Sequence, residues 1–296
     1  MELMEYKNEI TEDNIQIIQN VYKIKIITIK QLFIGADKNT FVYTIESKNC
    51  KYFLKLRIGD FNESSIVLPY VLSQNIGEHI IEPIKTIDDQ LYYRIKNCVF
   101  ILYPFINGKS GFEKDLSREQ WLKFGKFMNK MHTIQLQNYH NIQYEKWNTK
   151  WSVKLRKYLD NVYEIEKIDK YVKQFVTFID SKRAIINEIL IKTEELNIKV
   201  KNYENNYCLC HGDIHAGNIF IAEDNNFYIV DWDTLIMAPK ERDLMFIGGG
   251  IGNKWNNKIE NEYFYKGYGK RDDINKTIMV YYRNTRGTIT GGRYGE

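Results

Sequence analysis

The chain has 296 residues, of which 44% are hydrophobic, so it is long enough to bury a sizeable core in two lobes or two modest domains. Its 42 basic and 38 acidic residues leave a formal charge of +4, which is too small and too evenly spread to favour a nucleic-acid partner. No segment approaches the roughly 18 consecutive apolar residues of a membrane span, the charged amino terminus lacks a signal-peptide core, and the four cysteines have no disulfide spacing. We therefore expect a globular cytoplasmic protein without a membrane partner.

The first part of the chain has the pattern of a sheet. Runs of β-branched and aromatic residues at 24–29, 40–46 and 50–56 alternate with turn residues, which is typical of short antiparallel strands. The polar turn between Leu32 and Val42 contains Gly35, Asn39 and Thr40, where backbone amides could approach a nucleotide phosphate. An ordinary hairpin turn would have the same residues.

Lys55 is a candidate ligand of nucleotide phosphates. It lies between apolar neighbours in the third run, where an ammonium group is costly unless it meets an anion. Glu63, at the start of the next predicted helix, could fix it as an ion pair. A lysine at a strand edge whose ammonium group reaches water is the alternative.

The chain then changes from strands to helices. Strands predicted at 91–95 and 99–103 lead through Tyr103 to Phe105, an extended segment whose backbone groups could bind an adenine edge, although a surface loop fits equally well. Ser117 is placed to cap a helix whose apolar stripe ends at His132, a residue that we interpret as structural. Residues 150–201 have the pattern of amphipathic helices with solvated faces.

The segment His211-Gly212-Asp213-Ile214-His215-Ala216-Gly217-Asn218 indicates phosphoryl transfer. Asp213 could accept a hydrogen bond and then the proton of a substrate hydroxyl. Asn218 and Asp231 offer the oxygen ligands that Mg²⁺ prefers, and a predicted hairpin turn over 222–226 would bring them to one end of two paired strands.

Two other interpretations apply to this segment. Its aspartate and asparagine residues also favour turns, so they could serve only to connect a strand to a hairpin. Four zinc-type ligands are present as well: Cys208, Cys210, His211 and His215. Their spacing lacks the separated half-sites of a structural zinc site, and a zinc site would leave Asp231 unexplained.

Residues 211–218, together with Ile229-Val230-Asp231-Trp232-Asp233, resemble the aminoglycoside phosphotransferase family, which shares the protein-kinase fold. The resemblance implies an α+β fold of two lobes: residues 1–103 with an antiparallel sheet plus helix that binds the nucleotide, and a mainly helical lobe, 104–296, for catalysis and substrate. It implies ATP and Mg²⁺ as cofactors, with Asp213 as the catalytic residue and Asn218 and Asp231 as metal ligands. It also implies that Asp243 supports the catalytic loop through hydrogen bonds.

With the family-like segments 102–106 and 238–250, the resemblance implies transfer to a hydroxyl of an aminocyclitol or aminoglycoside antibiotic, with spectinomycin as the expected acceptor and resistance as the outcome. The second motif is Asp-Trp-Asp where protein kinases have Asp-Phe-Gly, which disfavours a protein substrate. Asp233 and Glu241 would attract a small, cationic, hydroxylated molecule, although surface or cap roles fit them as well. The alternatives are a kinase of choline-like or sugar-like alcohols and a catalytically weak nucleotide-binding protein.

The carboxyl-terminal segment departs from the family pattern. Residues 283–293 are polar and glycine-rich and lack the apolar helical pattern with which the family continues. We therefore expect the chain to be cut short there and the wall of the substrate cleft to be altered, which makes substrate binding less predictable than the fold.

Overall fold

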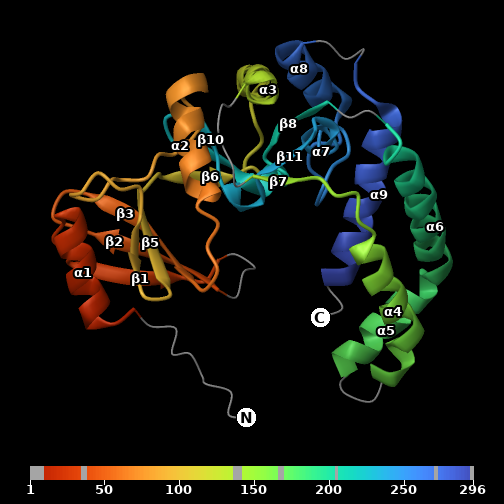
Figure 1. Cartoon of the computed structure of the whole chain (residues 1–296), viewed down its shortest axis with the longest axis horizontal. Coiled ribbons are helices and arrows are strands. Elements are labelled where there is room, and N and C mark those ends of the chain that lie inside the picture. The colour runs from red at the N-terminus through yellow and green to blue at the C-terminus, as the bar shows by residue number, and fades with distance from the viewer. Residues whose placement is uncertain are drawn as a thin grey trace. The chain divides into compact units, whose positions relative to one another are not determined.

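The structure is a computed structural model that describes residues 10–34, 39–135, 142–165, 170–203, 206–269 and 273–293. The chain divides into two compact units (Figure 1): unit 1 comprises Met1–Asp115 and Gly217–Thr234, and unit 2 comprises Leu116–Ala216 and Leu235–Glu296. The boundary expected after residue 103 stays a prediction. Within the described ranges, no helix combines the length and the apolar character that a membrane crossing requires.

Unit 1 contains a five-stranded antiparallel sheet in the order β1-β2-β3-β5-β4. Its strands are β1 (Thr28–Leu32), β2 (Thr40–Glu46), β3 (Lys51–Ile58), β4 (Tyr93–Ile95) and β5 (Cys98–Pro104). The predicted sheet is therefore confirmed, but its first strand begins at Thr28 and not at residue 24. Thr28 pairs with Glu46, the last residue of β2, so the preceding residues have no strand beside them to continue the ladder.

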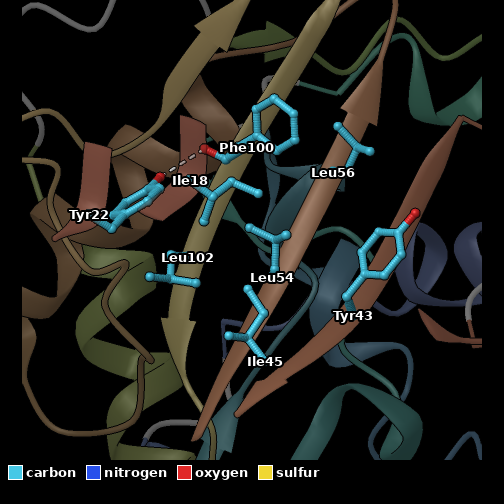
Figure 2. Packing of buried hydrophobic residues seen from close by; sticks show 8 residues of the cluster. All are labelled: Ile18, Tyr22, Tyr43, Ile45, Leu54, Leu56, Phe100 and Leu102. Carbon is cyan, nitrogen blue, oxygen red and sulfur yellow. Dashed lines mark hydrogen bonds between the residues drawn. The ribbon is translucent and has the colours of Figure 1, made fainter. Parts of the chain in front are cut away.

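Helix α1 (Glu12–Tyr22) covers one face of this sheet. Alternate residues of the strands point to α1 because side chains in a strand alternate between its two faces. Figure 2 shows the resulting core and the hydrogen bond of 3.0 Å that the Tyr22 hydroxyl donates to the carbonyl oxygen of Phe100. Burial of this phenol raises its pKa. The buried core residues are Ile18, Tyr22, Tyr43, Ile45, Leu54, Leu56, Phe100 and Leu102.

Helix α2 (Ser64–Ile76), whose Ile66 packs against Val99 and Ile101 of β5, belongs to the same unit and continues through Pro69. A second antiparallel sheet has the order β10-β9-β6, formed by β6 (Gly108–Ser110), β9 (Ile219–Ala222) and β10 (Phe227–Ile229). A Cβ atom on Gly108 would lie 2.3 Å from the carbonyl oxygen of Ile221, so only glycine allows this pairing. The sheet joins residues 217–234 to unit 1.

Unit 2 is mainly helical. Helix α3 (Arg118–Thr133) begins with the predicted cap at Ser117, which forms a complete capping box with Gln120. Helix α8 (Lys258–Tyr268) packs closely against α3, because Gly125 and Gly267 leave room for the facing backbone. The predicted amphipathic region forms α4 (Lys150–Ile165), α5 (Lys170–Ser181) and α6 (Arg183–Val200).

A three-stranded sheet in unit 2 has the order β7-β11-β8 and leads into the candidate catalytic loop. Its strands are β7 (Gln143–Tyr144), β8 (Tyr207–Cys210) and β11 (Ile236–Pro239), and the short helix α7 (Glu241–Leu244) follows β11. Short 3-10 helices occur at η1 (Ala216–Asn218) and, in unit 1, at η2 (Trp232–Thr234).

The last helix, α9 (Lys276–Arg293), continues through residues 283–293, although these residues lack the apolar helical pattern expected from the family. The helix lies beside α6 and α4 (Figure 1) and is anchored by Ile278, Tyr281 and Tyr282, which are buried. The next turn of the helix is held by polar contacts of Arg283 and Arg286. Polar contacts of this kind leave no apolar periodicity in the sequence.

Candidate active site

The candidate catalytic loop begins where β8 ends, at Cys210, and contains Asp213. Its backbone is held by Asp243 of α7, whose side chain is fully buried. The carboxylate of Asp243 accepts hydrogen bonds of 2.8 Å from the backbone amides of both His211 and Gly212. This is the supporting role that the family resemblance implied for Asp243.

His132 completes this support from helix α3. Its Nε2 lies 3.1 Å from a carboxylate oxygen of Asp243, and its Nδ1 lies 2.9 Å from the hydroxyl of Tyr268. Burial disfavours the charged form of both groups, but the hydrogen bond between them and the attraction of opposite charges nearby together outweigh it. As a result, the pKa of Asp243 is held below its usual value and the pKa of His132 is raised. The structural role predicted for His132 is confirmed.

Asp213 is accessible on one side and held on another. Its side chain is 19% exposed, and Oδ1 lies 2.9 Å from Nη1 of Arg286 on helix α9. Oδ2 lies 3.7 Å from Nε2 of His215. Sequence reasoning missed Arg286, because it is 73 residues from Asp213 in a segment that did not resemble the family.

The two candidate metal ligands come together in unit 1. Asn218 directly precedes β9, and Asp231 follows β10 by two residues, at the same end of the predicted hairpin. The amide of Val230 donates a hydrogen bond of 3.0 Å to the carbonyl oxygen of Asn218. Asp231 adopts a left-handed backbone conformation with φ of 63°, and its side chain is 55% exposed. Two oxygen-bearing side chains at one hairpin end fit the preference of Mg²⁺.

Lys55 lies beside the same hairpin end. Its Nζ is 2.9 Å from Oδ2 of Asp233 and 3.7 Å from Oδ1 of Asp231. Arg57 also forms an ion pair with Asp233. Burial disfavours ionisation of Asp233, but the two cations outweigh it and hold the pKa of this carboxyl below its usual value. Unit 1 therefore gathers two cations and two carboxylates at one place.

Lys55 and Glu63, which were expected to form an ion pair, have other partners in the structure. Glu63 occupies the position before the first turn of α2, and its Oε1 accepts a hydrogen bond of 2.9 Å from the hydroxyl of Tyr92. Among the described residues, the ion-pair partners of Lys55 are Asp231 and Asp233. Lys55 is thus paired with the carboxylates of Asp231 and Asp233, which follow β10, and not with Glu63 at the start of α2.

Asp233 and Glu241 were expected to attract a cationic substrate. Asp233 is engaged by Lys55 and Arg57, as described above. Glu241 is 3% exposed, and its carboxylate accepts a hydrogen bond of 2.7 Å from the backbone amide of Asn275. These contacts favour the structural alternative that the sequence left open for both residues, and the substrate role stays a prediction.

The remaining candidates for nucleotide binding lie along the large sheet. Gly35 lies outside the described residues. The carbonyl oxygen of Asn39 accepts a hydrogen bond from Ile58, and Thr40 begins β2. Tyr103 pairs with a residue of β3, and its burial raises its pKa. The amide of Phe105 donates to the carbonyl oxygen of Lys51 at 3.1 Å, so this amide extends the ladder of the sheet.

The structure bears on the zinc interpretation. In the described part of the chain, ligand atoms of Cys208, Cys210 and His132 lie within 4.8 Å of one another, so His132 takes the place of the two histidines that the sequence suggested. Both imidazole nitrogens of His132 already form hydrogen bonds, to Tyr268 and Asp243. The arrangement is therefore that of a hydrogen-bonded core.

A cavity of about 330 Å³ lies within unit 2, beside β7 and helix α9. Aromatic side chains line much of it, and Glu145, whose side chain is 10% exposed, supplies a carboxylate. Oε2 of Glu145 lies 3.5 Å from Nη1 of Arg242 and accepts a hydrogen bond of 3.2 Å from Tyr282. Sequence reasoning missed this cavity, although the aromatic residues near Glu145 were a usable signal. Its aromatic lining residues are Tyr144, Trp151, Tyr281 and Tyr282.

Comparisons with known proteins identify the family. Residues 72–273 match the model of the phosphotransferase enzyme family. A spectinomycin phosphotransferase solved with ADP and spectinomycin is 34% identical, with a TM-score of 0.91 over 98% of this chain and 88% of that chain. The same enzyme solved with AMP is also 34% identical, with a TM-score of 0.88 over 96% of this chain and 88% of that chain.

A choline kinase from Streptococcus pneumoniae, 12% identical, shares only the fold, with a TM-score of 0.59 over 95% of this chain and 88% of that chain. No curated protein matches the chain. The match to the family model spans more than half of the sequence and includes the loop with Asp213 and the hairpin with Asp231. The chain therefore belongs to the phosphotransferase enzyme family and is an ATP-dependent phosphotransferase with a hydroxyl group as acceptor.

Proposed function

We propose that the enzyme transfers the γ-phosphoryl group of ATP to a hydroxyl of an aminocyclitol antibiotic, most specifically spectinomycin, and so confers resistance. The observation that carries this proposal is the 34% identity, over 98% of the chain, to a protein solved with ADP and spectinomycin. The retained oxygen and cation groups around Asp213 and Lys55 support it.

Asp213 acts on the acceptor in this proposal. Its carboxylate accepts a hydrogen bond from the attacking hydroxyl, orients the oxygen toward the γ-phosphorus and takes the proton as the new bond forms. The hydrogen bonds from His211 and Gly212 to Asp243 keep the loop in one conformation. This rigidity supports the orientation, because phosphoryl transfer depends mainly on positioning and charge.

The nucleotide is assigned to the groups of unit 1. Asn218 and Asp231 would hold Mg²⁺, which neutralises charge on the phosphates when it is bound. Lys55 would contact the phosphates, and Arg57 pairs with Asp233 beside it. The nucleotide phosphates would then compete with the carboxylates for the ammonium group of Lys55.

The cavity of unit 2 is the proposed subsite for the cationic part of the acceptor. Aromatic faces suit an ammonium group through cation–π attraction, and the ammonium group would compete with Arg242 for the carboxylate of Glu145. Thr285 lines this cavity, and the next residue, Arg286, contacts Asp213. The proposed subsite and the candidate base are therefore linked through one turn of α9.

The first experiment measures ADP release with spectinomycin as acceptor, with the product identified by phosphorus and proton NMR. Asp213→Asn should lower kcat by about 10²- to 10⁴-fold, the usual contribution of a general base. Transfer to a choline-like or sugar-like alcohol but not to spectinomycin would replace the acceptor within the same chemistry. Nucleotide binding without transfer to any acceptor in a broad screen would refute the proposal.

A second experiment tests the subsite. Glu145→Gln keeps the shape of the side chain and removes its charge, so KM for spectinomycin should rise while KM for ATP stays constant. Glu119→Gln, at an exposed position in the first turn of α3, is the matched control for loss of one negative charge. Equal KM values for spectinomycin in both variants would remove the cavity from the substrate site.

A further inference from the structure

Arg286 is the charged residue nearest to the candidate base that neither the sequence pattern nor the family resemblance identified. It lies on α9, and its Nη1 is 2.9 Å from Oδ1 of Asp213. Both side chains are about four-fifths buried, at 21% and 19% exposure. An ion pair shielded to this degree is screened less by solvent and salt than one on the surface.

The guanidinium group of Arg286 is also positioned from its other side. It lies over the ring of Phe246 at 5.4 Å from the ring centroid, a geometry that favours a cation–π contact. The ring of His215 lies 6.1 Å from the same ring of Phe246. Arg286 and His215 therefore both lie beside Asp213, and both contact the ring of Phe246.

The helix that carries Arg286 is itself fastened to the segment that carries Phe246. Arg283, one turn earlier on α9, donates hydrogen bonds to the carbonyl oxygens of Met245 at 3.1 Å and Ile247 at 2.9 Å. Buried Tyr281 and Tyr282 anchor the preceding turn. The guanidinium of Arg286 is thus presented to Asp213 from a helix whose position is fixed by other contacts.

We propose that Arg286 is a positioning residue, which holds Oδ1 of Asp213 so that Oδ2 is presented to the acceptor hydroxyl. Arginine suits this task because its guanidinium stays charged, and it meets the buried Oδ1 as an ion pair without an aligned hydrogen bond. A displacement of about 1 Å in a reacting group can cost on the order of 100-fold in rate. The inference rests on the proposed function, because it assigns a role to the base of that reaction.

The kinetic test compares Arg286→Ala and Arg286→Lys with the wild type under saturating ATP and spectinomycin. We expect kcat to fall by about 10- to 100-fold in the alanine variant while KM for ATP stays constant, and to recover in part in the lysine variant. A matched control is Lys276→Ala, which removes one positive charge from an exposed position in the first turn of the same helix. This control should leave kcat within about threefold of the wild type.

A double-mutant cycle tests the contact without relying on activity. Unfolding free energies are measured for Asp213→Ala, Arg286→Ala and the double variant, and a contact pair should give effects that do not add. Additive effects would overturn the proposal, and so would a wild-type kcat in Arg286→Ala. A wild type that phosphorylates no acceptor would instead refute the proposed function, and the positioning role with it, even if the cycle showed coupling.

Discussion

Replacement of Asp243 should destabilise unit 2 and disable the loop that carries Asp213. The carboxylate is fully buried and accepts three hydrogen bonds, from the amides of His211 and Gly212 and from Nε2 of His132. Asp243→Asn keeps the size of the side chain but replaces one acceptor oxygen by a donor. In either orientation of the amide, at least one buried N–H then faces another donor.

The expected loss follows from this geometry. One buried donor without an acceptor costs about 1–3 kcal/mol, and loss of the charge weakens the bond to His132 as well, so Asp243→Asn should cost about 2–4 kcal/mol. Asp243→Ala removes all three bonds and leaves the imidazole of His132 without its counter-ion, which should cost about 3–5 kcal/mol. Either value is a large part of the roughly 5–15 kcal/mol that stabilises a typical protein.

Urea unfolding, followed by tryptophan fluorescence, measures this effect. If the two units unfold in separate transitions, the transition of unit 2 should shift, because the three partners of Asp243 all belong to it. Asp273→Asn, at a side chain 64% exposed and paired with Lys240, is the matched control and should change stability by no more than about 1 kcal/mol. Stability of Asp243→Asn within about 0.5 kcal/mol of the wild type would refute the reasoning.

Three further outcomes are expected. Gly125→Ala should lower the free energy of unfolding by about 1–3 kcal/mol, measured by calorimetry, because its Cβ would lie 2.1 Å from the carbonyl oxygen of Phe264. The exposed Lys126→Ala on the same helix is the control and should have little effect, and equal effects of the two variants would contradict this prediction. The raised pKa of His132 adds stability that is fully present below the unfolded pKa of about 6.5 and is lost as the pH rises through the higher folded pKa. The wild type should therefore lose more stability than His132→Gln between about pH 6 and pH 9. Parallel pH profiles of unfolding would show that His132 carries no such linkage. Lys55→Ala should weaken ADP binding by about tenfold or more in titration calorimetry, whereas Lys48→Ala, at an exposed position in the turn before β3, should not. Unchanged affinity in Lys55→Ala would remove Lys55 from the nucleotide site.

Features that depend on neighbours in the chain were predicted well. The capping box at Ser117 depends on residues three positions apart, and the hairpin that unites Asn218 with Asp231 depends on a turn between two short apolar runs. The support of the catalytic loop by Asp243 followed from the family resemblance and is present in the structure. The first strand was placed too early, because its start depends on where its partner β2 ends.

Features that depend on distant partners were decided by the packed chain. Lys55 meets Asp233 across 178 positions of sequence, and this contact replaces the expected pair with Glu63. The contact of Arg286 with Asp213 and the cavity beside Glu145 likewise join segments far apart in the chain. Local patterns specify which element forms and which face it buries, whereas the partner of a charged side chain depends on where folding brings distant backbone together.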